Sequence, residues 1–128
     1  MDIVVSPNCT IYDAVEVMQP KNFSEMDAAR VMCAGGVVWK AAVAGELVAV
    51  AGLYDLGRGE AELWASFTPD ASKNMAGIFR KARLTLSRTS YLRILTCCNS
   101  RAGSRMAKLL GFVFLEQTEL GELWIWKV

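Results

Sequence analysis

The sequence predicts an α/β fold in which a mixed sheet of seven strands carries helices on both faces, and two observations support this class. Residues 60–116 read as strand, loop, long helix, strand, short helix and strand, with connections long enough to join parallel strands. Two earlier strands, residues 37–43 and 47–54, are almost continuously apolar, so that the side chains on both faces of each strand are apolar. This is typical of a sheet covered on both faces. The predicted order of elements is β-α-α-β-β-β-α-β-α-β-β.

The first third of the chain predicts one strand and two helices. Residues 3–5 form a short apolar strand. Thr10 followed by Asp13 is typical of a helix start, because the hydroxyl and the carboxylate can both accept hydrogen bonds from free amides. We expect this helix to run to about Gln19. A second helix is expected to begin at Ser24 and to end at the glycines that start with Gly35.

The middle of the chain predicts three consecutive antiparallel strands. Residues 44–46 are short enough to connect strands 37–43 and 47–54 as a hairpin. Residues 57–59 contain two glycines and turn the chain into a third strand, residues 62–67. This meander precedes the crossovers.

The last part of the chain predicts two crossovers and a terminal pair of strands. Apolar residues recur at helical spacing after residue 71, which predicts a long helix. These residues are Met75, Ile78, Phe79, Ala82 and Leu86. A strand at 92–97 and a helix at 101–110 follow, and Gly111 ends that helix. Residues 112–116 and 123–128 are expected to pair as antiparallel strands.

The length and composition are those of a single domain, residues 1–128. A chain of 128 residues with 53% apolar residues can bury a sizeable core. No run approaches the roughly 18 apolar residues that a membrane-crossing helix needs, and residues 1–7 lack the basic flank and long apolar run of a secretion signal. We therefore expect a soluble cytoplasmic protein with no membrane partner.

The absence of histidine and the presence of four cysteines limit the chemistry of the chain. Without histidine, Ser/His and Cys/His catalysis are excluded. The usual zinc spacings are also absent, so we expect no metal site. Cys97 and Cys98 are adjacent on a predicted strand and should point to opposite faces, which leaves them poorly placed to pair. We expect reduced thiols, with a thiol nucleophile as the alternative.

Charge is unevenly distributed along the chain. Residues 71–115 contain no acidic residue and nine basic ones, whereas the rest of the chain carries 5 basic and 13 acidic groups. One half is therefore suited to face anions, and a phosphate-bearing ligand is the first candidate. A solvated helix face is the alternative for the basic residues Arg80, Lys81, Arg83 and Arg88. We do not expect nucleic-acid binding, because no known binding motif accompanies these charges.

Two features of the sequence resemble a known fold family. The order of strands and helices, together with residues 106–112 (Met-Ala-Lys-Leu-Leu-Gly-Phe), is similar to the GCN5-related N-acetyltransferase (GNAT) superfamily. The resemblance covers nearly the whole chain. Residues 67–70 (Phe-Thr-Pro-Asp) and 79–81 (Phe-Arg-Lys) also resemble the small acetyltransferase-like internal virion proteins of short-tailed bacteriophages, which share this length.

The resemblance implies an acetyl-CoA site where the fourth and fifth strands diverge. A backbone amide near Ser66 or Phe67 would bind the thioester oxygen, and amides at the start of the next helix would bind the pyrophosphate. The residues implied for the coenzyme are Ser66, Phe67, Ala71, Ser72, Lys73, Asn74 and Ser100. The chain departs from the family where residues 70–75 contain no glycine and where Ala107 replaces the catalytic tyrosine.

Acetyl transfer needs a base for the amine and an acid for the departing thiolate. Glu62 is the candidate base, although the alternation of Glu60 and Glu62 is also typical of a solvated strand face. Tyr54 and Tyr91 are candidate acids, and buried tyrosines bonded to the backbone are the alternative.

The sequence leaves two functions open. The preferred one is a phage-type GNAT-fold protein with a degenerate acetyl-CoA loop, acting in virion assembly or in contact with a host or virion protein. It would have a protein partner and lie in the host cytoplasm or the virion. The alternative is an active acetyl-CoA-dependent N-acetyltransferase acting on a protein or a small amine.

Overall fold

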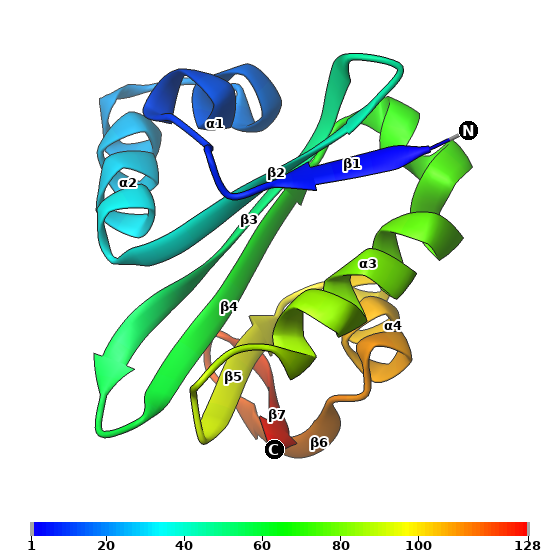
Figure 1. The fold of residues 1–128 in the computed structure, drawn as a ribbon. Coiled ribbons are helices and arrows are strands. Elements are labelled where there is room, and N and C mark those ends of the chain that lie inside the picture. Colours follow the sequence, from blue (N-terminus) through cyan, green and yellow to red (C-terminus); the bar gives the residue numbers. More distant parts are fainter. Residues whose placement is uncertain (1, 128) are drawn as a thin grey trace. The chain divides into compact units, whose positions relative to one another are not determined.

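The computed structural model describes residues 2–127 and contains seven strands, four α-helices and one 3-10 helix. The strands are β1 (Ile3–Ser6), β2 (Gly36–Val43), β3 (Glu46–Gly57), β4 (Glu60–Phe67), β5 (Arg93–Cys98), β6 (Val113–Thr118) and β7 (Gly121–Lys127). The helices are α1 (Ile11–Met18), α2 (Phe23–Ala34), η1 (Pro69–Asn74), α3 (Met75–Ser87) and α4 (Arg101–Leu110). The strand order is β1-β2-β3-β4-β5-β7-β6, which confirms the predicted α/β class with a mixed sheet (Figure 1).

The chain forms two compact units. Unit 1 comprises Met1–Tyr54 and Trp64–Ile78, and unit 2 comprises Asp55–Leu63 and Phe79–Val128. Each unit is described separately below. The single-domain organisation stays a prediction.

Side-chain caps fix the starts of both helices in the N-terminal part of unit 1. Thr10 and Asp13 form the predicted capping box: the Asp13 amide donates to Thr10 Oγ1 at 3.2 Å and the Thr10 amide donates to Asp13 Oδ2 at 3.0 Å. The predicted cap of α2 at Ser24 is wrong. Asn22 is the cap, because its Oδ1 accepts the Glu25 amide at 2.9 Å, so α2 begins earlier.

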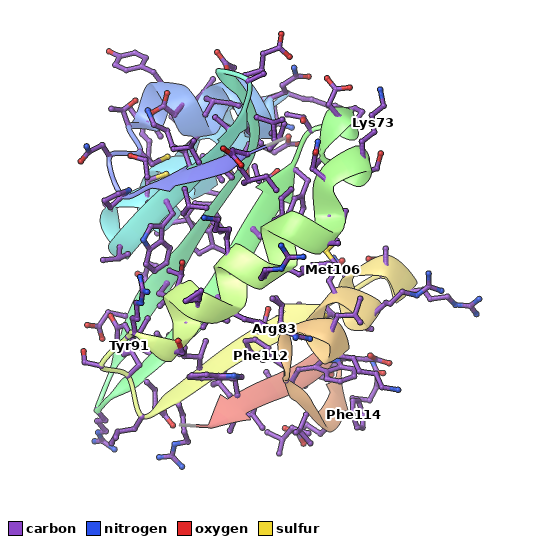
Figure 2. The ribbon with its side chains drawn as sticks, turned by 45° about the vertical axis from the view of Figure 1, so that its right-hand side comes forward. Lys73, Arg83, Tyr91, Met106, Phe112 and Phe114 are labelled. Atoms are coloured by element: carbon purple, nitrogen blue, oxygen red, sulfur yellow. The ribbon has the colours of Figure 1, made fainter. Side chains whose placement is uncertain are left out.

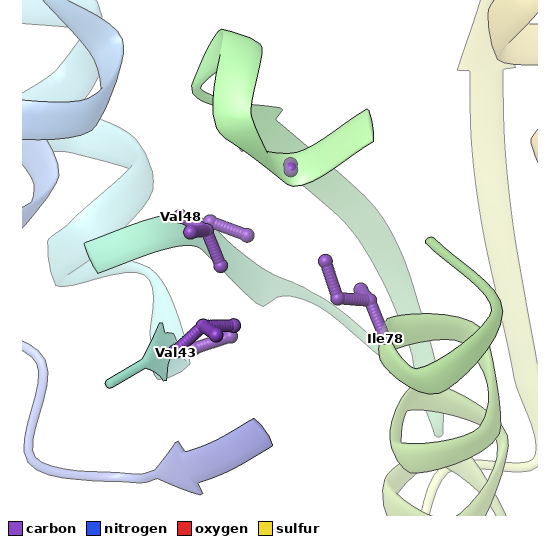
Figure 3. Close-up of a cluster of buried hydrophobic side chains, with 6 residues drawn as sticks. Val43, Val48 and Ile78 are labelled. Carbon is purple, nitrogen blue, oxygen red and sulfur yellow. The ribbon is translucent and has the colours of Figure 1, made fainter. Parts of the chain in front are cut away.

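Two apolar clusters stabilise unit 1. One joins α1 and α2 to the sheet through Val17, Val38, Val50 and Trp64. The other joins β2, β3, η1 and the start of α3, and Figure 3 shows Val43, Val48 and Ile78 in it. The predicted hairpin between β2 and β3 is confirmed. Helical elements therefore cover both faces of the strands of unit 1.

The segment after β4 differs from the predicted loop and helix start. Residues 69–74 form the 3-10 helix η1, and the α-helical hydrogen-bonding pattern begins only at Met75. Thr68, at the N-cap position, has no side-chain cap bond to the helix. Because Pro69 lacks an amide hydrogen and fixes its own φ, it suits the first helical position.

Parallel and antiparallel pairing meet at β5 in unit 2. Residues Glu60–Glu62 of β4 run parallel to Arg93–Leu95, while β7 pairs antiparallel with β5 on one side and with β6 on the other. The terminal strand pair is therefore confirmed. β6 is an edge strand of the sheet.

Helix α4 lies beside β5 and β6 in unit 2, and its ends match the prediction (Figure 2). Ser100 Oγ accepts the Gly103 amide at 3.0 Å and so caps the N-terminus. Gly111 has φ +100°, and the Phe112 amide donates to Ala107 O at 3.0 Å. Phe112 is buried immediately after this turn, which explains why a Leu-Gly-Phe sequence ends the helix.

None of the helices in residues 2–127 has the length and apolar character needed to cross a membrane. All four cysteines are free thiols, and the adjacent Cys97 and Cys98 are exposed and buried respectively. Their opposite orientation on β5 is as predicted.

Candidate functional site

The predicted coenzyme segment lies in unit 1, and its backbone differs from the expected row of free amides. The Ala71 amide donates to Thr68 O at 3.0 Å, so it is already used within the turn. The Ala71 side chain is only 1% exposed and belongs to the apolar cluster around Val43 and Ile78. The structure therefore contradicts the prediction that the Ala71 amide is free for a phosphate.

The other predicted coenzyme residues of unit 1 remain accessible to different degrees. Ser66, Phe67 and Asn74 are partly buried, while Ser72 and Lys73 are exposed. Ser72 Oγ donates to Pro69 O at 3.0 Å, which fixes the hydroxyl but leaves its lone pairs. Lys73 offers an exposed cation at the end of η1 (Figure 2).

Glu62, the candidate base, is exposed on β4 of unit 2. Its neighbour Ala61 faces the other way and is fully buried beside Ile94, which is the alternation expected of a strand with one solvated face. Glu60 forms an ion pair with Arg93 Nε at 2.9 Å on the exposed side. A base role for Glu62 stays a prediction.

The two candidate acids occupy packing positions. Tyr54 lies partly buried in unit 1, and its ring fills the space beside Gly35, where a Cβ atom would come within 2.1 Å of Cδ2. Tyr91 precedes β5 in unit 2 (Figure 2). Burial first, and then the charge and hydrogen bond of Asp55, raise the pKa of Tyr91, so its phenol holds the proton tightly.

Tyr91 and Ser100 are not brought together. Tyr91 lies just before the first residue of β5 and Ser100 just after the last, and the six residues of this strand rise about 3.3 Å each. Any chemistry at the carboxyl end of β5 therefore lies far from the Tyr91 hydroxyl.

An open groove of about 530 Å³ lies at the carboxyl end of β5, entirely within unit 2. It is bordered by the start of α4 and by the turn that joins β6 to β7. Its lining residues are Cys98, Asn99, Ser100, Arg101, Ser104, Gln117, Glu119, Leu120, Gly121 and Glu122. Of the predicted site residues, only Ser100 lies in this groove.

Two glycines allow the walls of the groove to approach the end of β5. Gly121 has φ +138°, and a Cβ atom there would lie 2.5 Å from the carbonyl oxygen of Cys98. A Cβ atom at Gly103 would lie 3.2 Å from Ser100 Oγ and 3.6 Å from Cys98 Cβ. The β6–β7 turn and the first turn of α4 are thus both held close to Cys98.

Glu122 is the most firmly held carboxylate of the groove. Its Oε1 accepts a hydrogen bond from Ser104 Oγ at 2.5 Å and another from Trp124 Nε1 at 3.1 Å. Burial, followed by the neighbouring Cys97 and Glu122, raises the pKa of the Cys98 thiol. The protonated thiol is a poor nucleophile, which counts against the thiol hypothesis.

Sequence reasoning missed Glu122 and most of the groove. Glu122 and Trp124 on β7 are distant in sequence from Cys98 and Ser104, and Glu122 meets these two residues only because β7 lies between β5 and β6. The local signal was Gly121, interpreted only as part of a turn. Residues 2–127 contain no group of three or more Cys, Asp and Glu side chains arranged to hold a metal ion, and the expected absence of a metal stays a prediction.

Comparison with solved structures defines the fold as that of the GNAT acetyltransferases. An acetyltransferase of the GNAT family from Staphylococcus aureus is similar with a TM-score of 0.75 and 12% identity, over 98% of this chain and 99% of that one. The PaiA N-acetyltransferase from Thermoplasma acidophilum, in complex with coenzyme A, is similar over 100% of both chains, with a TM-score of 0.72 and 12% identity.

The ribosomal-protein-S18-alanine N-acetyltransferase from Escherichia coli is similar with a TM-score of 0.69 and 17% identity, over 97% of this chain and 91% of that one. No protein-family model matches the sequence, and no curated protein matches it either. At these identities the likeness establishes the fold and leaves the activity to be argued from the site.

Proposed function

We propose that this protein is an acetyl-CoA-dependent N-acetyltransferase. The proposal is supported by the similarity in fold to acetyltransferases over nearly the full length of both chains, including one crystallised with coenzyme A. It implies a cytoplasmic location, where acetyl-CoA is available.

The position of the groove is the observation that carries the proposal. In open α/β sheets, ligands bind outside the carboxyl ends of parallel strands. β5 runs parallel to β4, and the groove opens at the carboxyl end of β5. Its polar and charged side chains include both hydrogen-bond acceptors and hydrogen-bond donors, as a site for a polar substrate requires.

The phosphates of the coenzyme would be held differently from the glycine-loop arrangement implied by the sequence resemblance. Since the Ala71 amide is used by Thr68, the donors that fit a phosphate in this segment are the Lys73 ammonium and the Ser72 hydroxyl. An exposed ammonium attracts phosphate by charge but lacks the geometric match of several converging amides. We expect weaker coenzyme binding than a row of free amides would give.

The proposed reaction balances without a further reagent. The amine nitrogen forms a bond to the acetyl carbon, and the carbon–sulfur bond of the thioester breaks. The neutral amine loses one proton and the departing thiolate gains one, giving an amide and the free thiol. When the amine arrives as ammonium, its additional proton must first pass to a base.

Calorimetry with acetyl-CoA tests the proposal. We expect saturable binding that Lys73→Ala weakens severalfold and that Lys81→Ala, which removes an exposed cation further along α3, leaves unchanged. Equal weakening by both variants would indicate nonspecific attraction. Absence of binding at millimolar acetyl-CoA would exclude the enzyme.

A turnover assay tests the base. Acetylation of amine substrates should be slowed by Glu62→Gln at unchanged coenzyme affinity if Glu62 is the base. Unchanged turnover in Glu62→Gln would eliminate this residue.

A second candidate is a protein-interaction role on the same fold, including the phage-type virion or host contact expected from the sequence. The structure favours it at one point: the Ala71 amide and side chain serve the turn and the core instead of a ligand. None of the three structures named above is a virion protein. Stable binding of a virion or host protein by a chain that binds no acetyl-CoA would support this candidate.

A further inference from the structure

We infer that the exposed sides of α3 and α4 in unit 2 form a docking surface for an acidic segment of a partner protein. The surface, called the basic face below, is made by six exposed basic residues. They are Arg80, Lys81, Arg88, Arg101, Arg105 and Lys108. The inference goes beyond the proposed acetyl transfer, because it concerns neither the coenzyme nor the amine.

Three residues of the basic face form one stripe along α4. Arg101, Arg105 and Lys108 occupy positions i, i+4 and i+7 of the helix, and all three are exposed. Ala107, on the other side of the helix, is buried. Because an α-helix rises 1.5 Å per residue, the stripe extends over about 10 Å.

Helix α3 adds its own cations beside this stripe. From residue 79 onward α3 belongs to unit 2 together with α4. Arg83 Nε donates to Leu109 O at 2.9 Å, and Arg83 Nη2 donates to the same oxygen, so α3 lies against the last turn of α4 (Figure 2). Arg80 and Lys81 are exposed in the turn before Arg83, and Arg88 is exposed directly after the helix. The two helices therefore present one continuous basic surface.

The chain supplies no counter-charge along these helices. Residues 71–115 contain no Asp or Glu, so neither α3 nor α4 can form the i,i+4 ion pairs that commonly stabilise exposed helices. The two ion pairs in the part of the chain that the structure describes are Lys40 with Asp13 and Arg93 with Glu60, and both lie outside the basic face. Like charges at i,i+4 repel each other, so an external anion would relieve this repulsion.

The position of Arg101 opposes the stability of its own helix. Arg101 is the first residue of α4, where free amides carry partial positive charge, and the first turn of α4 contains no acidic residue. Helices α1 and α2, in contrast, carry Asp13 and Glu25 in their first turns. A cation at this end of α4 adds to the attraction for an anion that the helix start already exerts.

The side chains between the cations favour a protein segment over other polyanions. Leu84 on α3 and Leu109 on α4 are each 45% exposed, and they offer apolar area that apolar side chains of a peptide can cover. Sequence-tolerant binding of single-stranded nucleic acid uses exposed aromatic rings for stacking. Phe79, the one aromatic residue of the two helices, is partly buried. Acidic residues with interspersed apolar ones therefore fit the basic face best.

An anionic lipid surface fits less well. Helices that lie in a membrane interface insert a broad apolar face among the lipids. Leu86 of α3 and Ala107 of α4 instead turn the apolar sides of their helices into the protein, where both are buried. The basic face can attract a lipid surface by charge, but it has no broad apolar side to insert.

Binding of an acidic peptide tests the inference. We would titrate a fluorescently labelled Glu-Glu-Leu-Glu-Glu-Leu-Glu-Glu peptide with the full chain, without acetyl-CoA, and follow the anisotropy at low and at physiological ionic strength. We expect saturable binding that weakens as salt screens the charges. A peptide with Gln in place of every Glu should not bind. A uridine octanucleotide and phosphatidylserine vesicles, as the other anionic probes, should bind more weakly than the acidic peptide.

Charge-reversal variants locate the binding surface. Arg105→Glu on α4 and Arg80→Glu on α3 should each weaken peptide binding about fivefold or more, since each removes an attraction and adds a repulsion. Arg30→Glu, the same change at an exposed position of α2, should leave it unchanged. Arg105→Lys keeps the charge and should retain most of the affinity. Arg83 is left intact because it holds the end of α4, and thermal unfolding checks that each variant stays folded.

The leucines distinguish a protein partner from any polyanion. Leu84→Ala should weaken binding of the leucine-containing peptide severalfold. It should not change binding of a peptide in which Ala replaces both leucines. Equal behaviour of the two peptides in this comparison would show that the face recognises charge alone, which would overturn the assignment to a protein segment.

Other results would also overturn the inference. These are the absence of saturable binding, equal losses in Arg30→Glu and Arg105→Glu, or tighter binding of the octanucleotide or the vesicles. Displacement of the peptide by saturating acetyl-CoA would assign the basic face to the coenzyme instead. Failure of the proposed function gives a different result, because a chain that binds no acetyl-CoA can still bind the acidic peptide.

Discussion

Lys40 Nζ lies 3.1 Å from Asp13 Oδ2, so one ion pair joins strand β2 to the first turn of helix α1. The same carboxylate oxygen accepts the Thr10 amide in the capping box. A single side chain thus holds the helix start and attaches it to the sheet. The Thr10 backbone bond first, and then the Lys40 hydrogen bond, lower the pKa of Asp13 below its ordinary value.

Asp13→Asn should lower the free energy of unfolding by about 1 kcal/mol at pH 7, as loss of a good cap usually does. The folded pKa of Asp13 is lowered, so its contribution is present above the unfolded pKa of about 3.9 and is lost as pH falls through the folded value. The gap between wild type and variant should therefore close on acidification. Urea unfolding at several pH values measures it, with Glu16→Gln, exposed on the same helix, as control. A gap that widened toward low pH would contradict this account.

Gly52→Ala should destabilise the protein by about 1–3 kcal/mol, the usual cost of overpacking. A Cβ atom at this position would lie 2.6 Å from Cζ2 of the buried Trp64 ring. In a Trp64→Phe background the smaller ring should make the same substitution less costly. A double-mutant cycle by urea unfolding measures the coupling, and full additivity would show that the contact does not matter.

Gly121→Ala should cost more stability than Gly45→Ala. Both glycines have positive φ, so both substitutions carry backbone strain of about 1–2 kcal/mol. Only at Gly121 would the new Cβ meet backbone, at 2.5 Å from Cys98 O, while nothing lies within 4 Å at Gly45. Thermal unfolding of the two variants compares them. Equal losses would mean that the β6–β7 turn moves freely from β5.

Thiol labelling should distinguish the four cysteines. Burial raises the pKa of the Cys9 thiol to about 11 and also raises the pKa values of Cys33 and Cys98. Iodoacetamide at pH 8 should therefore modify the exposed Cys97 first, because only the thiolate reacts. Peptide mass spectrometry after short exposure identifies the site. Early modification of Cys98 would show that the end of β5 opens in solution.

The parts of the fold that depend on local sequence could be predicted. Thr10 and Asp13 lie three residues apart at the start of α1 and cap it without help from distant residues. Gly111 followed by Phe112 ends α4 through its own backbone bonds. The cap of α2 was misplaced because both Asn22 and Ser24 are good capping residues. Asn22 is the cap because its Oδ1 accepts the hydrogen bond of the Glu25 amide.

The candidate site could be predicted only in part, because its contacts join distant segments. Ser100 was named only because the resemblance to the GNAT family implies a coenzyme residue at this position. The contact of Ser104 with Glu122 depends on the register between β5 and β7, which no local pattern reveals. The Ala71 amide was misjudged because sequence periodicity does not distinguish a 3-10 turn from the first turn of an α-helix.

The outer position of β6 has a consequence for handling the protein. Val113, Phe114 and Leu115 are 65%, 48% and 52% exposed on this last strand, whose outer backbone groups can template another chain. Glu116 directly follows this apolar run and is the one charged residue of β6. Neutralising Glu116 by substitution or by acid should promote fibrillar or amorphous aggregation at high concentration, which makes this carboxylate a gatekeeper of colloidal stability.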